Sequence, residues 1–307
     1  PEHAARIVGD FSGRLQGGDR FVLCDAAGNP VDETGVFEGG WSDGGGSSLE
    51  LRDPWADNLN PGAWADSDES AKSAWQTVTY RMVAGQNYGS TRWNEFRIGL
   101  LDEGMVLLDD VSVVRDPLGA REELIQNGHF ETVTGNTHWR FLGHHRGEFV
   151  ADPDNGANRV LQLTAEGRAV MNHNHVETTF HDNAPLADGQ LYEVSYRGRW
   201  VAGSPQVNTR AYFSKLARTT VLAMPTRLGT PAAPNSRRVG NAGPTFSGLQ
   251  HAPVVPSPNQ AVVISVRAGD PDGVGSAMVS YRVNPATAFR TLPMTPQYLD
   301  FRFPGLT

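Results

Sequence analysis

The chain consists largely of short runs of β-branched and aromatic residues bounded by Gly, Pro, Asp or Asn. Runs of strand length lie at 20–25, 47–52, 76–83, 95–101, 105–114, 159–164, 190–199, 206–214, 262–268 and 277–283. Such runs predict β-strands, and the residues that bound them predict turns. Helical spacing of apolar residues is nearly absent, and only Asp66–Ala74, with Ser67 or Asp68 as N-cap, predicts a short helix. The sequence therefore predicts an all-β protein built of tandem β-sandwiches.

Length and charge limit the class of protein further. At 307 residues the chain has room for two domains or three small ones. The Pro-rich stretch from Leu228 to Pro258 predicts a connector between domains. A net charge of −8 without a basic stripe argues against nucleic acid and against an anionic membrane surface as partners. The longest apolar runs, such as Met105–Leu108, are far shorter than the roughly 20 residues that span a bilayer, so no membrane insertion is expected.

The sequence has one cysteine, Cys24, in the strand run at 20–25. A single cysteine excludes an intrachain disulfide and the zinc and iron–sulfur sites that need several cysteines. We expect Cys24 to be a small buried apolar residue, because no neighbouring residue would activate a catalytic thiol.

Several motifs in the first part of the chain match one known family. They are Gly18–Asp25, Gly28–Asp32, Gly46–Leu51, Asp53-Pro54 and Trp64–Ser67. Together they resemble the second half of a bacterial lamin-tail domain, a small immunoglobulin-like β-sandwich. The segment Gly229–Asn235 resembles the segment that closes this family. The resemblance implies a lamin-tail-like domain at 1–71 that closes at about 226–240, with another domain inserted between.

The inserted stretch, 72–225, resembles the carbohydrate-binding jelly rolls of the 4/9 type. The motifs that carry this resemblance are Asn127–Glu131, Trp139, Gly156–Leu163 and Leu186–Ser195. The strands that usually end such a domain come first here, at Trp75–Met82, Glu95–Leu101 and Asp109–Val113. One jelly roll in permuted order explains this arrangement, because the termini of a sandwich often lie close together. It predicts that the early strands pair with the later ones, and two incomplete jelly rolls are the alternative.

The last part, 243–307, resembles a truncated immunoglobulin or fibronectin-type module. The matching segments are Gly243–Phe246, 262–268, Asp270–Val274 and Ser280–Asn284. A set of domains like this is similar to the accessory regions of large exported bacterial proteins. The resemblance therefore implies an extracellular or cell-surface location and further domains of a larger polypeptide as partners.

Strand alternation separates a core face from a binding face in the run at 206–214. Val207, Thr209, Ala211 and Phe213 share one face, and the more polar set lies on the other. His173 and His175 are two residues apart, so on a strand they share a face with Glu177. We expect this polar surface to bind carbohydrate, since arginine and tyrosine offer hydrogen bonds and a ring to sugars. Its candidate residues are Asn208, Arg210, Tyr212, His173 and His175.

Aromatic residues are the other candidates for sugar contact. Trp200, Tyr196, Tyr212 and Phe213 are possible platforms, whereas Trp139 is assigned to the core. The remaining tryptophans are expected in the core of the lamin-tail-like part or at its boundary. They are Trp41, Trp55, Trp64 and Trp75.

No residue is assigned a catalytic role, and the expected function is binding or adhesion rather than catalysis. Two alternatives stay open. The chain can be a purely structural spacer that presents another domain. The His173, His175 and Glu177 spacing also suits a metal triad, which would fit a metal-dependent hydrolase.

A structural calcium site is expected at Asp109, Asp110 and Glu131. In the permuted jelly roll the strand with the two aspartates lies near the segment with the glutamate, and related modules often hold calcium there. Carboxylate oxygens are the ligands that calcium prefers. The alternative is that these acids only cap neighbouring backbone amides.

Overall fold

The computed structural model describes residues 18–37, 39–85, 94–171, 173–211, 214–270, 272–283 and 286–297. The chain divides into two compact units. The sandwich unit includes Val36–Glu50 and Ala65–Arg238, and the ribbon unit includes Phe21–Gly35, Leu51–Trp64 and the described residues from Val239 onward.

The described residues are nearly all β-structure, as the sequence predicts. Helical structure among them is limited to 3-10 turns, which include η2 (Pro61–Ala63) and η3 (His181–Asn183). Within this part of the chain, no helix combines the length and the apolar character needed to cross a bilayer.

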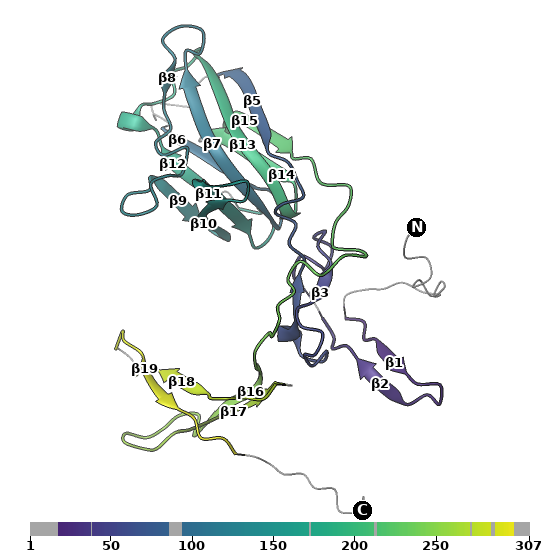
Figure 1. Ribbon diagram of the computed structural model, residues 1–307. Helices are drawn as coiled ribbons and strands as arrows, with labels where there is room; N and C mark the ends of the chain where they lie inside the picture. The colour runs from purple at the N-terminus through teal and green to yellow at the C-terminus, as the bar shows by residue number, and fades with distance from the viewer. Residues whose placement is uncertain are drawn as a thin grey trace, which may run out of the picture. The chain divides into compact units, whose positions relative to one another are not determined.

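The sandwich unit contains two antiparallel sheets that form two layers (Figure 1). The six-stranded sheet has the order β10-β11-β7-β13-β5, with β8 also paired to β7. The five-stranded sheet has the order β15-β14-β6-β12-β9. The bounds of the first sheet are β5 Gln76–Val83, β7 Gly104–Arg115, β8 Glu122–Glu123, β10 His145–Asp152, β11 Asn155–Ala165 and β13 Leu191–Gly203. Those of the second are β6 Glu95–Leu100, β9 Trp139–Leu142, β12 His175–Thr179, β14 Gln206–Ala211 and β15 Lys215–Val221.

The early strands pair with later ones, as the permuted order predicts. Strand β5 pairs with β13, β6 lies between β12 and β14, and β7 lies between β11 and β13. The strands from 76 to 221 thus form one sandwich and not two incomplete ones.

Period-two alternation explains which side chains fill the space between the sheets. On β14 the side chains of Val207, Thr209 and Ala211 are fully buried, while Asn208 and Arg210 are half-buried on the outer face. Large apolar residues of both sheets complete this core, and each buried one contributes about 1.5–3 kcal/mol. They include Phe96, Ile98, Leu108, Phe130, Leu161, Val176, Tyr192 and Trp200.

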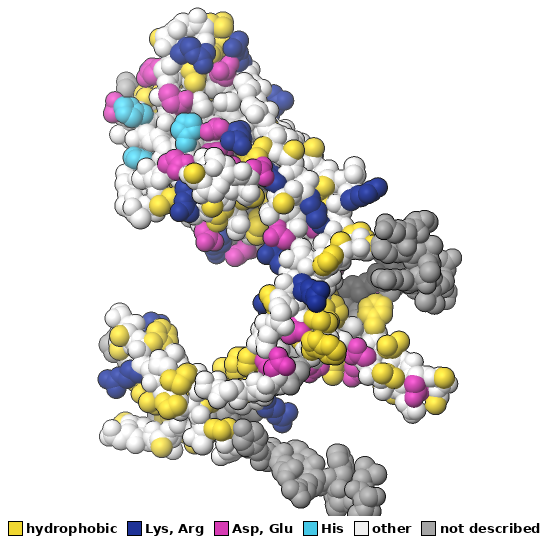
Figure 2. All heavy atoms as spheres, in the orientation of Figure 1, with side chains coloured by type: hydrophobic (Ala, Val, Ile, Leu, Met, Phe, Trp, Pro, Cys, Tyr) yellow, Lys and Arg dark blue, Asp and Glu magenta, His cyan; other side chains and the backbone are white. Residues whose placement is uncertain are grey.

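The ribbon unit contains three two-stranded ribbons. They are β1 (Val22–Cys24) with β2 (Pro30–Glu33), β16 (Thr245–Ala252) with β17 (Val263–Gly269), and β18 (Met278–Tyr281) with β19 (Arg290–Pro293). Figure 2 shows hydrophobic side chains on the surface of this part of the chain. The lamin-tail-like sandwich and the immunoglobulin-like or fibronectin-like module remain predictions.

Two expectations from the sequence are wrong here. Cys24 is exposed and not buried, because no second layer covers the β1–β2 ribbon among the described residues. Trp55, expected in a core, is 78% exposed.

The short helix expected at Asp66–Ala74 does not form. Asp66 ends strand β4 (Trp64–Asp66), which pairs with β3 (Leu49–Leu51), and irregular structure and turns follow it. The Asp68 side chain accepts the amide of Ser70, which closes a local turn. Ser67 and Glu69 are buried and accept backbone amides from Ser48 and Gly229. These distant hydrogen bonds replace the i to i−4 bonds of a helix.

The segment predicted to close the lamin-tail-like part returns to two buried glutamates, Glu50 and Glu69. The Gly229 amide donates to Glu69 Oε1 at 2.9 Å across 160 residues of sequence, and Lys72 bonds the Gly229 carbonyl. Glu50 accepts from the hydroxyl groups of Thr230 and Ser236. Burial alone would raise the pKa of Glu50, but these hydrogen bonds outweigh it and hold that pKa below its ordinary value. The two carboxylates thus fix the point at which the chain returns from the sandwich.

Replacing Glu69 with Ala should release the closing segment while leaving the sandwich folded. The substitution leaves the Gly229 amide without its acceptor, which costs roughly 1–3 kcal/mol. We expect faster proteolytic cleavage within 226–240, measured by limited proteolysis and mass spectrometry. Glu148→Ala, at an exposed position on β10, is the control. Equal cleavage rates in both variants would contradict the role of Glu69.

Candidate functional site

A row of charged side chains crosses the outer face of the five-stranded sheet. The strand register places Arg210 of β14 beside Arg97 of β6, Arg97 beside Glu177 of β12, and Glu177 beside Arg140 of β9. Neighbouring residues on paired strands lie about 5 Å apart, so these side chains interact directly.

The next row contains a gap, because Gly99 of β6 lies beside Asn208 of β14. A groove of about 70 Å³ opens there, with Arg97, Gly99, His175, Asn208 and Arg210 among the residues that line it. A Cβ atom at position 99 would lie 3.0 Å from His145 Nε2. Any larger residue would therefore fill the hollow and press on His145.

The charges around the groove are unevenly compensated. Glu177 accepts from His175 Nε2 at 3.0 Å and from Arg140 Nη2 at 2.9 Å, and it lies 3.4 Å from Arg97 Nε. The hydrogen bond from His175, followed by that from Arg140, outweighs burial and lowers the pKa of Glu177 to about 2. Glu177 is therefore a permanent anion with its charge already shared.

Arg210 differs, because no acidic or hydrogen-bonding group among the described residues contacts its guanidinium. Burial, and then the positive charge of Arg97, lower the pKa of Arg210. The groove thus holds two neighbouring arginines. Arg97 is paired with Glu177, whereas half-buried Arg210 has no counter-ion among the described residues. Such an arrangement favours an anionic ligand group.

His145 packs against Gly99 beside the groove. Its Nε2 accepts the Leu100 amide at 3.0 Å, just beyond the point where β12 stops pairing with β6. The proton of the neutral ring then lies on Nδ1, and that atom is buried without a hydrogen-bond partner among the described residues. Burial, and then the charges of His144 and His175, lower the pKa of His145 to about 4.

Three of the five predicted ligand-binding residues meet in this groove: Asn208, Arg210 and His175. His173 is exposed in the turn before β12 and does not line the groove. Tyr212 lies outside the described residues, as does Phe213.

The predicted aromatic platforms lie mostly elsewhere. Trp200 and Tyr196 are 0% and 1% exposed, so their assignment to a sugar-binding surface is wrong. Trp139 is buried, as expected. Trp41, expected in the core, is only partly buried and lines a cavity together with five glycines. The glycine-rich loop around it is a sequence signal that could have indicated an open ring.

The metal triad of His173, His175 and Glu177 is not assembled. In the described ranges only one group of three or more such side chains brings its ligand atoms within 4.8 Å of one another. That group is Asp109, Asp110 and His129.

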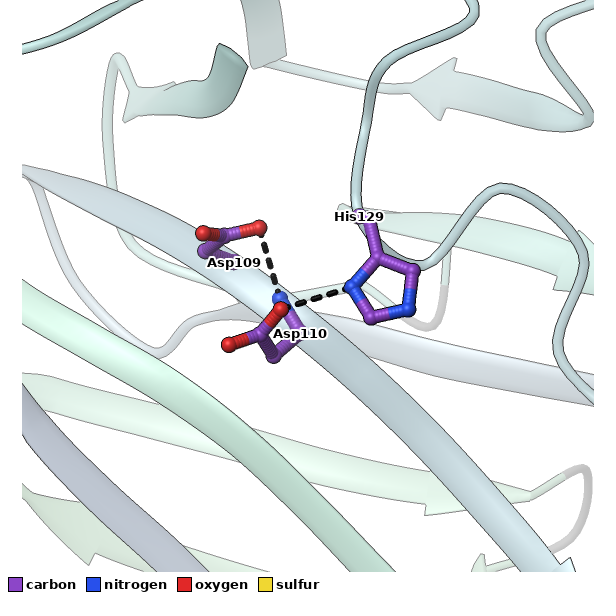
Figure 3. A group of neighbouring side chains, drawn as sticks. All are labelled: Asp109, Asp110 and His129. Atoms are coloured by element: carbon purple, nitrogen blue, oxygen red, sulfur yellow. Dashed lines mark hydrogen bonds and ion pairs between the residues drawn. The ribbon is translucent and has the colours of Figure 1, made fainter. Parts of the chain in front are cut away.

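Figure 3 shows this cluster, with both aspartates on β7 and His129 on a loop that faces Asp110. His129 Nδ1 lies 2.7 Å from Asp110 Oδ1. Asp110 has a φ of 50°, and the pairing of β13 with β7 shifts register at Ser195 and Arg197. This bulge turns Asp110 outward while Asp109 stays buried.

Arg197 neutralises both aspartates, at 3.2 Å from Asp109 Oδ2 and 3.5 Å from Asp110 Oδ2. Burial is the main reason that the pKa of Asp109 is raised above its ordinary value, although Asn158 and Arg197 act in the opposite direction. Glu131, the third predicted ligand, is not part of the group, and its Oε1 accepts the Arg159 amide at 3.0 Å.

This donor set fits calcium poorly. The two carboxylates supply oxygen ligands, but an imidazole nitrogen is not a calcium ligand and the guanidinium of Arg197 already provides positive charge. Calcium at Asp109 and Asp110 stays a prediction that the structure does not test.

Protein families, curated proteins and solved structures were compared with the chain, and none of them matches it. The all-β sandwich is thus established by the structure itself, and the resemblances drawn from the motifs remain predictions.

Acidification should weaken the sandwich through His145. Its pKa of about 4 in the fold lies below the ordinary histidine value of about 6.5. The unfolded chain therefore binds this proton first as the pH falls, and the free energy of unfolding should drop by roughly 3 kcal/mol between those two values. Urea unfolding across this range measures the loss. His145→Asn should flatten the dependence of the unfolding free energy on pH. The control His181→Asn, at an exposed site, should leave that dependence unchanged. The same pH dependence in both variants would refute the role of His145.

Replacing Arg197 with Gln should leave Asp109 buried without its counter-ion. We expect a loss of roughly 2 kcal/mol in the free energy of unfolding, less than for a fully buried pair because Arg197 is partly exposed.

If the aspartates bind calcium, millimolar Ca²⁺ should stabilise this variant more than the wild type. Chemical denaturation of the variant and the wild type in Ca²⁺, in Mg²⁺ and in chelator measures both effects. No selective response to Ca²⁺ would contradict the calcium prediction, and an undiminished stability would contradict the role of Arg197.

Proposed function

We propose that this chain is a non-catalytic binding region of an exported bacterial surface or secreted protein, and that it binds carbohydrate through the groove of the five-stranded sheet. The observation that carries the proposal is the half-buried guanidinium of Arg210. It faces a hollow at Gly99, beside Asn208, and no described residue neutralises it.

The groove offers the hydrogen-bonding groups that a sugar needs. Arg210 and Arg97 present planar donors, which match a carboxylate in two-point contact. The Asn208 side chain can both donate to and accept from a hydroxyl. A hollow of about 70 Å³ has room for one substituent of this size rather than for a whole ring. The expected ligand group is therefore the carboxylate of a uronate, with the sugar ring resting on the surface.

The metal-dependent hydrolase has little geometric support. His173 lies outside the groove, and the Nε2 atom of His175 is used in the hydrogen bond to Glu177. The structural spacer remains the alternative, and the binding experiment separates the two.

Arg210→Ala should reduce binding to acidic polysaccharides at least tenfold. One charge-assisted contact contributes roughly 1.5–3 kcal/mol, which corresponds to such a change. Affinity electrophoresis in gels that contain acidic or neutral polysaccharides measures the effect. Arg159→Ala is the matched control, because Arg159 is an exposed arginine on the opposite sheet. Unchanged binding in Arg210→Ala would place the site elsewhere, and a wild type that binds no glycan would favour the spacer.

A further inference from the structure

A second and larger opening lies at one end of the sandwich unit. It is a cavity of about 650 Å³, and its walls come from the glycine-rich loop at 39–45, from Leu101–Glu103, from Arg168 and from Gly203–Gln206. This volume is typical of ligand sites, whereas the groove at Gly99 takes only a small group. Its one aromatic residue is Trp41.

The fold holds the ring of Trp41 in a defined place. The amides of Trp41 and Ser42 both donate to the carboxylate of Asp66, at 2.9 and 2.8 Å. The Gly203 amide donates to the Gly45 carbonyl at 2.7 Å. A Cβ atom on Gly203 would lie 2.8 Å from Trp41 Cζ3, and one on Gly45 would lie 3.0 Å from Trp41 Cε3. The six-membered ring therefore rests against two glycines that cannot be enlarged.

The polar rim of the cavity is mainly acidic. Asp43, Asp102 and Glu103 contribute carboxylates, and Arg168 pairs with Asp102 at 3.3 Å. Within the described chain, the indole Nε1–H of Trp41 has no hydrogen-bond acceptor. An apolar ring face next to carboxylate acceptors suits a neutral sugar, which offers C–H groups on one face and hydroxyls at its edge. It does not suit a uronate, whose charge these acids would repel.

The cavity and the groove adjoin one another along β14. Leu101 lines both openings, and Arg168 of the cavity precedes Ala169 of the groove. Gln206, Asn208 and Arg210 lie on one face of β14, with Gln206 in the cavity and the other two in the groove. At about 3.4 Å per residue, the stretch from Gln206 to Arg210 spans roughly 14 Å, which is longer than one sugar ring.

We infer that the two openings form one binding cleft, in which a neutral sugar stacks on Trp41 while a neighbouring uronate places its carboxylate at Arg210. The ligand class is a polysaccharide that combines uronate and neutral sugars. This inference rests on the proposed function of the groove and adds the second contact and the composition of the ligand.

The test compares oligosaccharides of equal length by isothermal titration calorimetry. Hyaluronan fragments alternate uronate and neutral sugars, oligogalacturonate carries a uronate at every position, and chito-oligosaccharide is neutral throughout. We expect the wild type to prefer the alternating ligand, and Trp41→Ala to lower its affinity for that ligand roughly tenfold. Free glucuronate should bind both proteins equally, because it reaches only Arg210.

Two further variants make the outcome decisive. Trp41→Phe keeps an aromatic face and should retain most of the affinity, which separates stacking from a folding defect. Trp55→Ala removes the 78% exposed tryptophan of the ribbon unit and should change nothing. Equal affinity for the three ligands, or no loss in Trp41→Ala, overturns the inference while an effect of Arg210→Ala keeps the proposed function. Loss of binding in Trp41→Ala without any effect of Arg210→Ala overturns the single cleft and the groove proposal together.

Discussion

The sandwich depends on the pairing of β7 with β13. These are its longest strands, at 12 and 13 residues, and each also pairs on its other side, with β11 and β5. The pair joins segments about 90 residues apart in the sequence. The hydrogen bond from Arg197 to Asp109, for example, joins residues 88 positions apart. Such long-range contacts carry a loop-closure cost and slow folding. The partly buried pair of Arg197 and Asp109 acts at the point where these two segments meet.

The groove depends on an absence of side-chain atoms rather than on a particular reactive group. Gly99 has no side chain on the outer face, and His145 packs against it while accepting the Leu100 amide that the neighbouring strand does not reach. Gly45 and Gly203 leave the corresponding space for the ring of Trp41. In both openings glycine lets the backbone and a large ring approach closely.

The strand runs and their alternation were readable from the sequence, because they follow from local chemistry alone. Asn208 and Arg210 could be placed on one face for that reason, and their half-buried positions agree with it. The environment of a residue was not readable where it depends on a covering layer. Cys24 has a strand-like setting but no second sheet covers it among the described residues. Trp200, by contrast, follows the alternation of Tyr192 and Tyr196 on the buried face of β13, so its place between the sheets was readable from the pattern. The same limit applies to Glu131, whose carboxylate is taken by a backbone amide from a distant strand.

The protonation state of Glu177 differs from that of a general acid. A glycosidase needs one carboxylic acid that stays protonated near neutral pH, and such a group has a raised pKa. The pKa of Glu177, a carboxylate on the same outer face, is instead lowered to about 2 by hydrogen bonds from His175 and Arg140. Asp109 does have a raised pKa, but it belongs to the other sheet and is enclosed by Asn158 and Arg197. A charged outer face in which Arg210 has no counter-ion among the described residues is suited to hold an anionic group in place.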